Sequence, residues 1–192
     1  MLYGEIDAKG LKLDERELAA RLCVPISELP AGLDAVAAEL ALASNAAYSA
    51  VEVDVVRDGG ALTLGGFSVA SEALFRVLSG CNRAVLLTVT LGRGSERLLR
   101  GRAAISPSEH FLADAVADAM AEAAADEAER CIFGGAEHTL RFSPGYSDLP
   151  LELVSRIVEL TDAGKLLGVT LSRTYLATPS KTVTAIIGIK GD

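Results

Sequence analysis

The sequence Arg-Phe-Ser-Pro-Gly-Tyr at residues 141–146 says more about this chain than any other stretch. Pro144 fixes its φ at about −65°, and Gly145 can take a positive φ without a steric penalty, so the pair predicts a tight turn. Arg141 enters the turn with a permanent positive charge, and Tyr146 leaves it with a hydrogen-bonding ring. This pattern is typical of a surface turn after a strand, but also of a loop that presents polar groups to a ligand.

Strands are predicted on both sides of this turn by two kinds of apolar pattern. Val51, Val53 and Val55 alternate with acidic residues, which indicates a half-buried strand, and the Gly-Gly pair after Asp58 predicts a hairpin over residues 50–64. Residues 84–91 are apolar with little alternation and predict a central strand covered on both faces. Further strands are expected at 138–142, 168–171 and 183–189.

Helices are predicted between these strands, and the longest runs from Ser106 or Pro107 to about Cys131. Proline is favoured in a first helical turn, and two glycines follow the expected end. Shorter helices are expected at 14–22, 31–47, from Ser68 or Ser71 to about Gly80, and 151–160.

The order of these elements predicts the fold class and the domain division. Helices and strands mix without regular alternation, so we expect an α+β fold in which helices pack on a twisted, antiparallel-dominated sheet. We expect residues 1–30 to form an N-terminal helical appendage and residues 31–192 to form a single α+β domain.

Composition excludes several classes of function. A formal charge of −8 and a pI near 4.8 argue against a nucleic-acid partner. Only three cysteines and two histidines are present, without a Cys-x-x-Cys pair, so a metal site is poorly supplied. The sequence shows neither a signal segment nor an apolar run of membrane-spanning length, and we expect a cytoplasmic protein without a membrane partner.

Acidic residues on the longest predicted helix form a column. Asp114, Asp118 and Glu122 lie four residues apart and so share one helix face. They could be a solvated face of an acidic protein, or carboxylates that meet a cationic ligand. Arg141 has a similar alternative, because its guanidinium could balance neighbouring acids instead of binding a ligand.

Other motifs predict little chemistry. The glycines of residues 91–94 follow a strand and open a helix, but the third glycine of a dinucleotide loop is missing. Residues 179–182 share only Lys-Thr with a phosphate-binding loop. No Ser/His/Asp set stands out, so we predict no catalytic residue and no metal ligand in this chain.

The stretch at residues 141–146 resembles the signature of a known family. Arg-x-x-Pro-Gly-Tyr is similar to the loop of the activation domain of cobalamin-dependent methionine synthase. Residues 78–92, 166–172 and 179–188 also resemble stand-alone, shortened relatives of that domain, and in order and spacing the likeness covers roughly residues 65–190.

This resemblance implies a binding site for S-adenosylmethionine. In the family the loop holds this ligand, which implies that the guanidinium of Arg141 pairs with its carboxylate and that Tyr146 stacks on it or hydrogen-bonds to it. Ser143 and Gly145 would contribute backbone groups. An acidic helix residue contacts the ligand in the family, and a local match places Asp118 there, with Glu122 as the second candidate.

The resemblance also implies a function and partners. The chain would be an accessory module that presents S-adenosylmethionine to a corrinoid-binding methionine synthase or methyltransferase lacking its own activation domain. That partner would supply the cobalamin, and an electron donor protein would reduce its oxidised cobalt before remethylation.

The sequence differs from the family in two places. Residues 147–150 read Ser-Asp-Leu-Pro where the family usually has Pro-Ala-Cys-Pro, and no counterpart of the family's N-terminal acidic contact stands out in residues 1–40. These differences favour an alternative, an interaction module that caps the corrinoid partner without binding S-adenosylmethionine. An unrelated small-molecule-binding domain is a third possibility.

Overall fold

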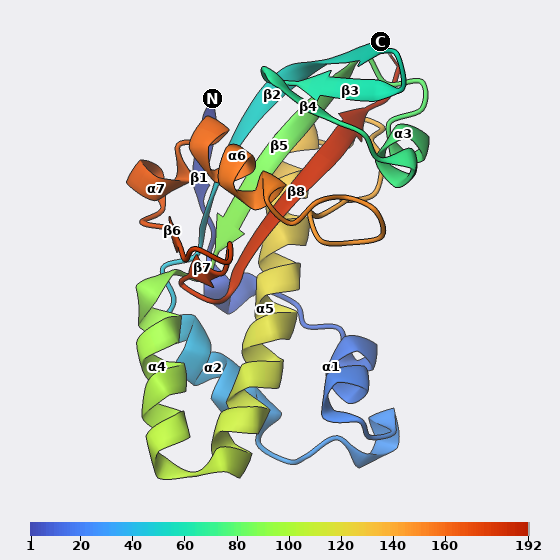
Figure 1. Cartoon of the computed structure of the whole chain (residues 1–192). Helices are drawn as coiled ribbons and strands as arrows, with labels where there is room; N and C mark the ends of the chain where they lie inside the picture. The colour runs from blue at the N-terminus through green and yellow to red at the C-terminus, as the bar shows by residue number, and fades with distance from the viewer. Residues whose placement is uncertain (192) are drawn as a thin grey trace.

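The computed structural model describes residues 1–191 (Figure 1). In chain order its elements are β1 (Leu2–Glu5), η1 (Ala8–Gly10), α1 (Glu15–Leu22), η2 (Ile26–Glu28), α2 (Leu33–Ala43), β2 (Ala47–Asp58), β3 (Ala61–Leu64), β4 (Phe67–Val69), α3 (Glu72–Val77), β5 (Arg83–Thr90), α4 (Gly92–Ile105), α5 (Pro107–Phe133), α6 (Leu153–Leu160), α7 (Ala163–Leu166), β6 (Thr170–Leu171), β7 (Ala177–Thr178) and β8 (Thr182–Ile189).

The main sheet has the strand order β4-β3-β2-β5-β8, and β1 also pairs with β2. Every strand pair within residues 1–191 is antiparallel, which confirms the predicted sheet type. The first residues of β2 pair with β1 on one side, and its last residues pair with β3 on that same side. The β2–β3 hairpin turns at Gly59 and Gly60, whose φ angles of 53° and 93° favour glycine.

Two apolar layers cover the two faces of this sheet. On one face, Tyr48, Leu87 and Val89 pack in a core shared with α1, α2 and α5. On the other face, Leu86 and Ile186 pack with side chains of α3 and α6. Figure 1 shows α5 behind the sheet and α6 in front of it. Strand β5 is buried along nearly its whole length, as the apolar run predicted.

The longest helix, α5, is buried on an alanine-rich face. Small side chains such as those of Ala113, Ala117 and Ala124 let the helix approach the sheet and its neighbouring helices closely. Proline stands in its first turn, and Gly134 ends it in the left-handed conformation, as predicted. The opposite edge of this helix carries the acidic column.

Some local predictions were wrong. Residues 138–142, all within the described chain, do not form a strand but only two isolated bridges to β8. The hydroxyl of Thr139 accepts a hydrogen bond from the Gly188 N–H at 2.8 Å. In a regular β-ladder that N–H would donate to a backbone carbonyl, so the side chain of Thr139 replaces a ladder hydrogen bond. The strand expected at 168–171 is reduced to β6, which pairs with β7 in a separate two-stranded sheet.

The N-terminal segment is more than a helical appendage. Leu2–Glu5 form strand β1 of the main sheet, and α1 packs on α5. The helical description of residues 1–30 is therefore incomplete, because a four-residue strand carries too short a pattern to be seen in sequence. A division of the chain at residue 30 stays a prediction. No helix in residues 1–191 is long and apolar enough to cross a membrane.

Candidate functional site

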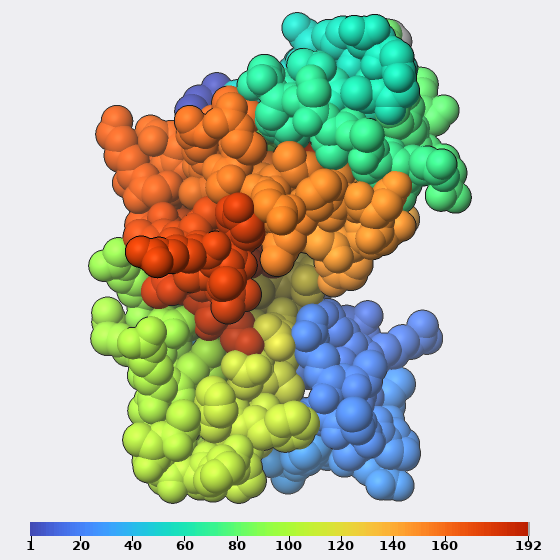
Figure 2. Space-filling view, in the orientation of Figure 1, coloured from blue at the N-terminus to red at the C-terminus, as the bar shows by residue number. Residues whose placement is uncertain are grey.

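A groove of about 430 Å³ lies between α5, residues 140–146 and the start of β8. Its lining combines charged, aromatic and aliphatic side chains: Glu122, Asp126, Glu129, Leu140, Arg141, Phe142, Ser143, Tyr146 and Val183. In Figure 2 the surface is hollowed where the orange loop meets the yellow helix. Four of the six site residues expected from sequence line this groove: Glu122, Arg141, Ser143 and Tyr146.

One wall is the Pro-Gly loop, which we define as residues 141–150. Gly145 has φ of 89°, as a glycine at that place allows, and its N–H donates to the Leu149 carbonyl at 2.8 Å. The Tyr146 N–H donates to the Ser143 carbonyl at 3.3 Å and closes the turn. Tyr146 itself is 69% exposed, so its ring is open to a ligand or a partner.

Asp148 anchors the loop to α3. Its carboxylate accepts hydrogen bonds from the Ser71 hydroxyl at 2.6 Å, the Glu72 N–H at 2.6 Å and the Ala73 N–H at 3.3 Å. The hydrogen bond from Ser71 holds the pKa of Asp148 below its ordinary value. The loop is therefore fixed at one end by a helix cap.

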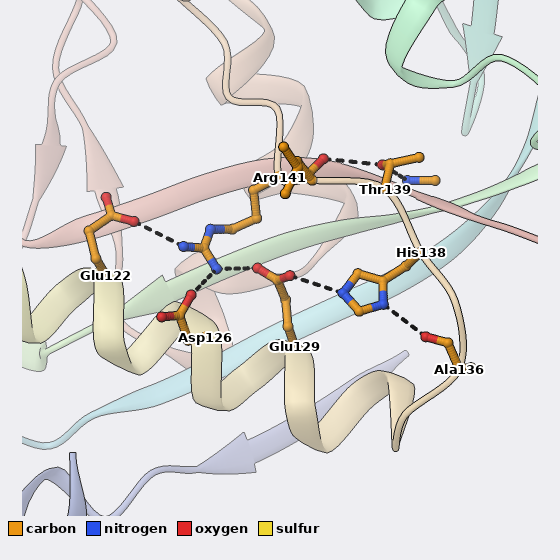
Figure 3. Close-up of polar contacts among 9 residues, drawn as sticks. Glu122, Asp126, Glu129, Ala136, His138, Thr139 and Arg141 are labelled. Atoms are coloured by element: carbon orange, nitrogen blue, oxygen red, sulfur yellow. Dashed lines mark hydrogen bonds and ion pairs between the residues drawn. The ribbon is translucent and has the colours of Figure 1, made fainter. Parts of the chain in front are cut away.

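Arg141 lies among three carboxylates of α5 (Figure 3). Its Nη1 is 2.8 Å from Asp126 and also contacts Glu129, while Nη2 is 3.1 Å from Glu122. Burial lowers the pKa of Arg141, but the hydrogen bond to Asp126 and the charge of Glu129 outweigh burial and raise the pKa above its ordinary value. The alternative of a cation that balances acids thus describes its contacts in this structure.

Glu129 joins Arg141 to His138. The Nε2 atom of His138 lies 3.3 Å from the Glu129 carboxylate, and Nδ1 lies 2.9 Å from the Ala136 carbonyl (Figure 3). The imidazole stacks on Phe133 with ring centroids 4.1 Å apart and an interplanar angle of 9°. Glu129 is therefore held between Arg141 and a His138 ring whose own orientation is fixed by Phe133 and Ala136.

Asp118 occupies a different place from Glu122. Its carboxylate is 2.7 Å from Lys181 and 3.1 Å from Arg21, and Lys181 also lies 2.8 Å from Asp114. In the described part of the chain, Asp118 is not among the residues that line the groove. Glu122 does line it, so the structure brings the second acidic candidate, rather than the first, next to Arg141.

Sequence reasoning missed Asp126 and Glu129. Both continue the column of Asp114, Asp118 and Glu122 at helical spacing, so the signal was present in the sequence. Together with Glu122 they place three carboxylates against the single guanidinium of Arg141. The groove consequently carries an excess of negative charge and suits a ligand with cationic groups.

A larger cavity, about 770 Å³, lies between α1, α2 and α5. Its walls are mainly leucine and alanine side chains, while Lys9, Glu15 and Asp34 are exposed. A specific ligand site usually has polar groups that converge on the ligand. The groove has that property, and we take it as the candidate site.

Comparison with known proteins rests on structure alone. No family model matches this sequence, and no curated protein matches it. A crystal structure of the MetH reactivation domain bound to AdoHcy is similar, with a TM-score of 0.76 and 16% sequence identity. The likeness covers 100% of this chain and 78% of that chain. The chain has the fold of the MetH reactivation domain.

The MetH reactivation fold is the one expected from the Arg-to-Tyr signature, and that prediction is confirmed. In this fold the Pro-Gly loop faces the acidic edge of α5, and Gly145 lies in the loop without lining the groove. Residues 1–191 contain no group of three or more His, Cys, Asp or Glu residues that could hold a metal ion.

Proposed function

We propose that this protein is an S-adenosylmethionine-binding reactivation module. One observation carries the proposal: in the fold of a domain that was crystallised with AdoHcy, the groove sets Arg141, Ser143 and Tyr146 opposite Glu122. S-adenosylmethionine has a carboxylate, an ammonium and a sulfonium. The groove offers a guanidinium for the anion and surplus carboxylates for the cations.

Each groove residue has a stated role in this proposal. Arg141 binds the carboxylate of the methionine moiety, and because a guanidinium has five N–H donors, it can do so while keeping a bond to α5. Glu122 faces the ammonium or sulfonium. Tyr146, which is largely exposed, stacks on the ligand or hydrogen-bonds to it. The backbone of Ser143 and Gly145 completes the loop wall.

The proposed partner is a corrinoid-binding methionine synthase or methyltransferase that lacks an activation domain. That partner would supply the cobalamin, whose reduced cobalt is the methyl acceptor, and an electron donor protein would reduce it. This chain would contribute the position and the electrostatic environment of the methyl donor. Exposed apolar side chains beside the groove support a partner surface here, with Leu140 88% and Leu151 42% exposed. We expect the complex to form in the cytoplasm.

Calorimetric titration with S-adenosylmethionine tests the proposal. Wild-type protein should bind with micromolar affinity, about −8 kcal/mol. Arg141→Ala should abolish measurable binding, and Tyr146→Ala should weaken it. Arg130→Ala is the matched control, because Arg130 also pairs with an α5 carboxylate, Glu127, but does not line the groove.

Folding of each variant is checked by circular dichroism, because Arg141→Ala leaves three carboxylates without their shared cation. Tyr146→Ala disturbs no ion pair and keeps the test valid if Arg141→Ala unfolds. Absence of binding heat for the folded wild-type protein would overturn the proposal for the isolated chain.

A second function is favoured by one observation. Arg141 is already paired with three carboxylates, so its charge is satisfied without a ligand. An interaction module that caps the corrinoid partner without binding S-adenosylmethionine would fit this state. It predicts a complex with the corrinoid domain on size-exclusion chromatography, together with no heat on titration with S-adenosylmethionine.

A further inference from the structure

Glu129 is the least exposed carboxylate around Arg141, with 14% of its side chain accessible compared with 39% for Glu122 and 72% for Asp126. One of its oxygens contacts Arg141 and the other lies 3.3 Å from Nε2 of His138 (Figure 3). A carboxylate held at both oxygens has little freedom to turn. The strength of the ion pair between Glu129 and Arg141 therefore depends on whether the His138 nitrogen that faces Glu129 carries a proton.

Both ring nitrogens of His138 face hydrogen-bond acceptors. Nε2 faces the Glu129 carboxylate, and Nδ1 faces the Ala136 carbonyl at 2.9 Å. A neutral imidazole has one N–H and one lone pair, so it can donate to only one of these oxygens. An imidazolium donates to both. The arrangement in this structure is thus satisfied in full only when His138 is protonated.

Contacts on two sides hold the His138 ring between these two acceptors. It stacks on Phe133, and the backbone of His138 bridges Ile189 of β8. The elements around the ring carry several other charged groups. They are Asp126, Glu127, Glu129 and Arg130 at the end of α5, Glu137 and Arg141 in the same segment as His138, and Lys190, whose N–H donates to the Glu137 carbonyl. Of these, Glu129 makes the ion pair with the ring.

We infer that His138 is a positioning residue for the groove, acting through Glu129 on Arg141. The inference rests on the proposed function, since Arg141 is taken as the group that binds the ligand's carboxylate. As an imidazolium, His138 shares the charge of Glu129 and leaves more of the guanidinium's attraction for the ligand. When His138 loses its proton, a lone pair faces Glu129, and the carboxylate pairs with Arg141 alone. Ligand affinity should therefore be higher when His138 is an imidazolium than when its ring is neutral.

The first test needs no ligand. Nitrogen-15 NMR over a pH series from about 5.5 to 8.5, the range in which histidine usually changes charge, reports whether each His138 nitrogen carries a proton. The Nε–H signal of Arg141 should move as His138 titrates, and it should stay still in His138→Gln and in Glu129→Gln. His110→Gln is the control, since His110 is the other histidine of the chain and lies on α5 away from the groove. If the Arg141 Nε–H signal of the wild-type protein does not move when His138 changes its protonation state, the inference is wrong.

The second test measures S-adenosylmethionine affinity by calorimetry over the same pH range. Wild-type affinity should fall on the order of fivefold from the acidic to the basic end, the low end of typical coupling between sites. The ligand's own α-amino group also titrates near the top of this range. Because His138→Gln keeps that ligand contribution, the difference between its profile and the wild-type profile isolates the histidine. If the affinities of wild type and His138→Gln change with pH in parallel, the inference is wrong even though both proteins bind. If neither protein binds but the Arg141 NMR signal still responds to His138, only the proposed function is wrong.

Discussion

The carboxylate of Asp148 accepts a 2.6 Å hydrogen bond from the hydroxyl of Ser71, which lies 77 residues earlier in the chain. Ser71 is the N-cap of α3, so this bond ties the Pro-Gly loop to the start of that helix. Asp148→Ala should remove the tie, lower the melting temperature by about 2–4 °C, and weaken ligand binding by letting the loop move. Asp58→Ala, at the β2–β3 turn, is a control for loss of an exposed aspartate. Equal melting temperatures for wild type and Asp148→Ala would show that the tie adds nothing.

The same residue predicts a pH dependence. Hydrogen bonding from Ser71 lowers the pKa of Asp148 in the folded protein, so the folded state binds fewer protons than the unfolded state as the solution is acidified. Its contribution should be complete above about pH 4, the ordinary range of aspartate, and should be lost as the pH falls through the lowered folded-state pKa. Thermal melts of wild type and Asp148→Asn from pH 7 to pH 2 measure this. The gap between the two melting temperatures should narrow at the acidic end, and a constant gap would count against the assignment.

Two glycines of α4 should respond in opposite directions to alanine. A methyl carbon on Gly94 would lie 1.7 Å from the Ala43 carbonyl oxygen, so Gly94→Ala should force α4 away from the end of α2 and cost about 3 kcal/mol or more. A methyl group on Gly101 meets no heavy atom within 4 Å. Gly101→Ala should stabilise the protein by about 0.5–1 kcal/mol through better helix propensity. Urea unfolding measures both, and similar values for the pair would refute the close approach.

Replacement of Lys181 should destabilise the protein more than replacement of any other lysine of the chain. Its side chain is only 8% exposed and lies between Asp114 and Asp118 at 2.8 and 2.7 Å. Lys181→Met leaves two carboxylates without this cation and should cost about 1.5–3 kcal/mol, as for hydrogen bonds to charged groups. Lys165→Met is the matched control, because Lys165 is 81% exposed and its ion pair to Asp162 is 3.8 Å long, so its loss should cost less than about 0.5 kcal/mol. Chemical denaturation that ranks the two variants equally would disprove this view of Lys181.

The acid excess of the groove predicts a preference between two ligands. S-adenosylmethionine carries a sulfonium, whereas AdoHcy has a neutral thioether at that position. Three carboxylates against Arg141 should favour the sulfonium ligand by roughly tenfold in affinity, the effect of about 1.4 kcal/mol. Asp126→Asn should reduce this ratio, because Asp126 lines the groove and is well exposed. Competition calorimetry compares the ligands, and an unchanged ratio in Asp126→Asn would exclude this carboxylate from the preference.

Sequence patterns correctly predicted the elements whose structure follows from residues that are close together in the chain. The apolar run of β5, the alternating valines of β2 and the proline-to-glycine limits of α5 all appear in the structure as the sequence indicates. The Arg-to-Tyr signature predicted the fold itself. Each of these signals needs only neighbouring residues to be recognised.

The remaining features depend on contacts between distant segments. Strand β1 pairs with β2 some 45 residues later in the chain, and its four residues show too short a pattern to indicate a strand. The acidic column on α5 was visible, but which acid meets Arg141 depends on where residues 138–141 cross the helix. The Thr139 hydroxyl helps to fix that path by accepting the Gly188 N–H of β8, and no pattern within the segment indicates this bond.

The acidic edge of α5 collects cations from three separate segments: Arg21 from α1, Arg141 from the Pro-Gly loop and Lys181 from the turn before β8. Charge thus attaches the Pro-Gly loop, which is one wall of the groove, to α5, and it also ties α1 and the turn before β8 to this helix. The sheet beneath is held by apolar burial. Mobile ions screen exposed charges, with a screening length of about 8 Å at physiological ionic strength and about 3 Å at 1 M. Concentrated salt should therefore weaken the pair between Arg141 and the 72% exposed Asp126 before it affects the sheet, which makes the ionic content of the surrounding solution a determinant of how firmly the loop is held against α5.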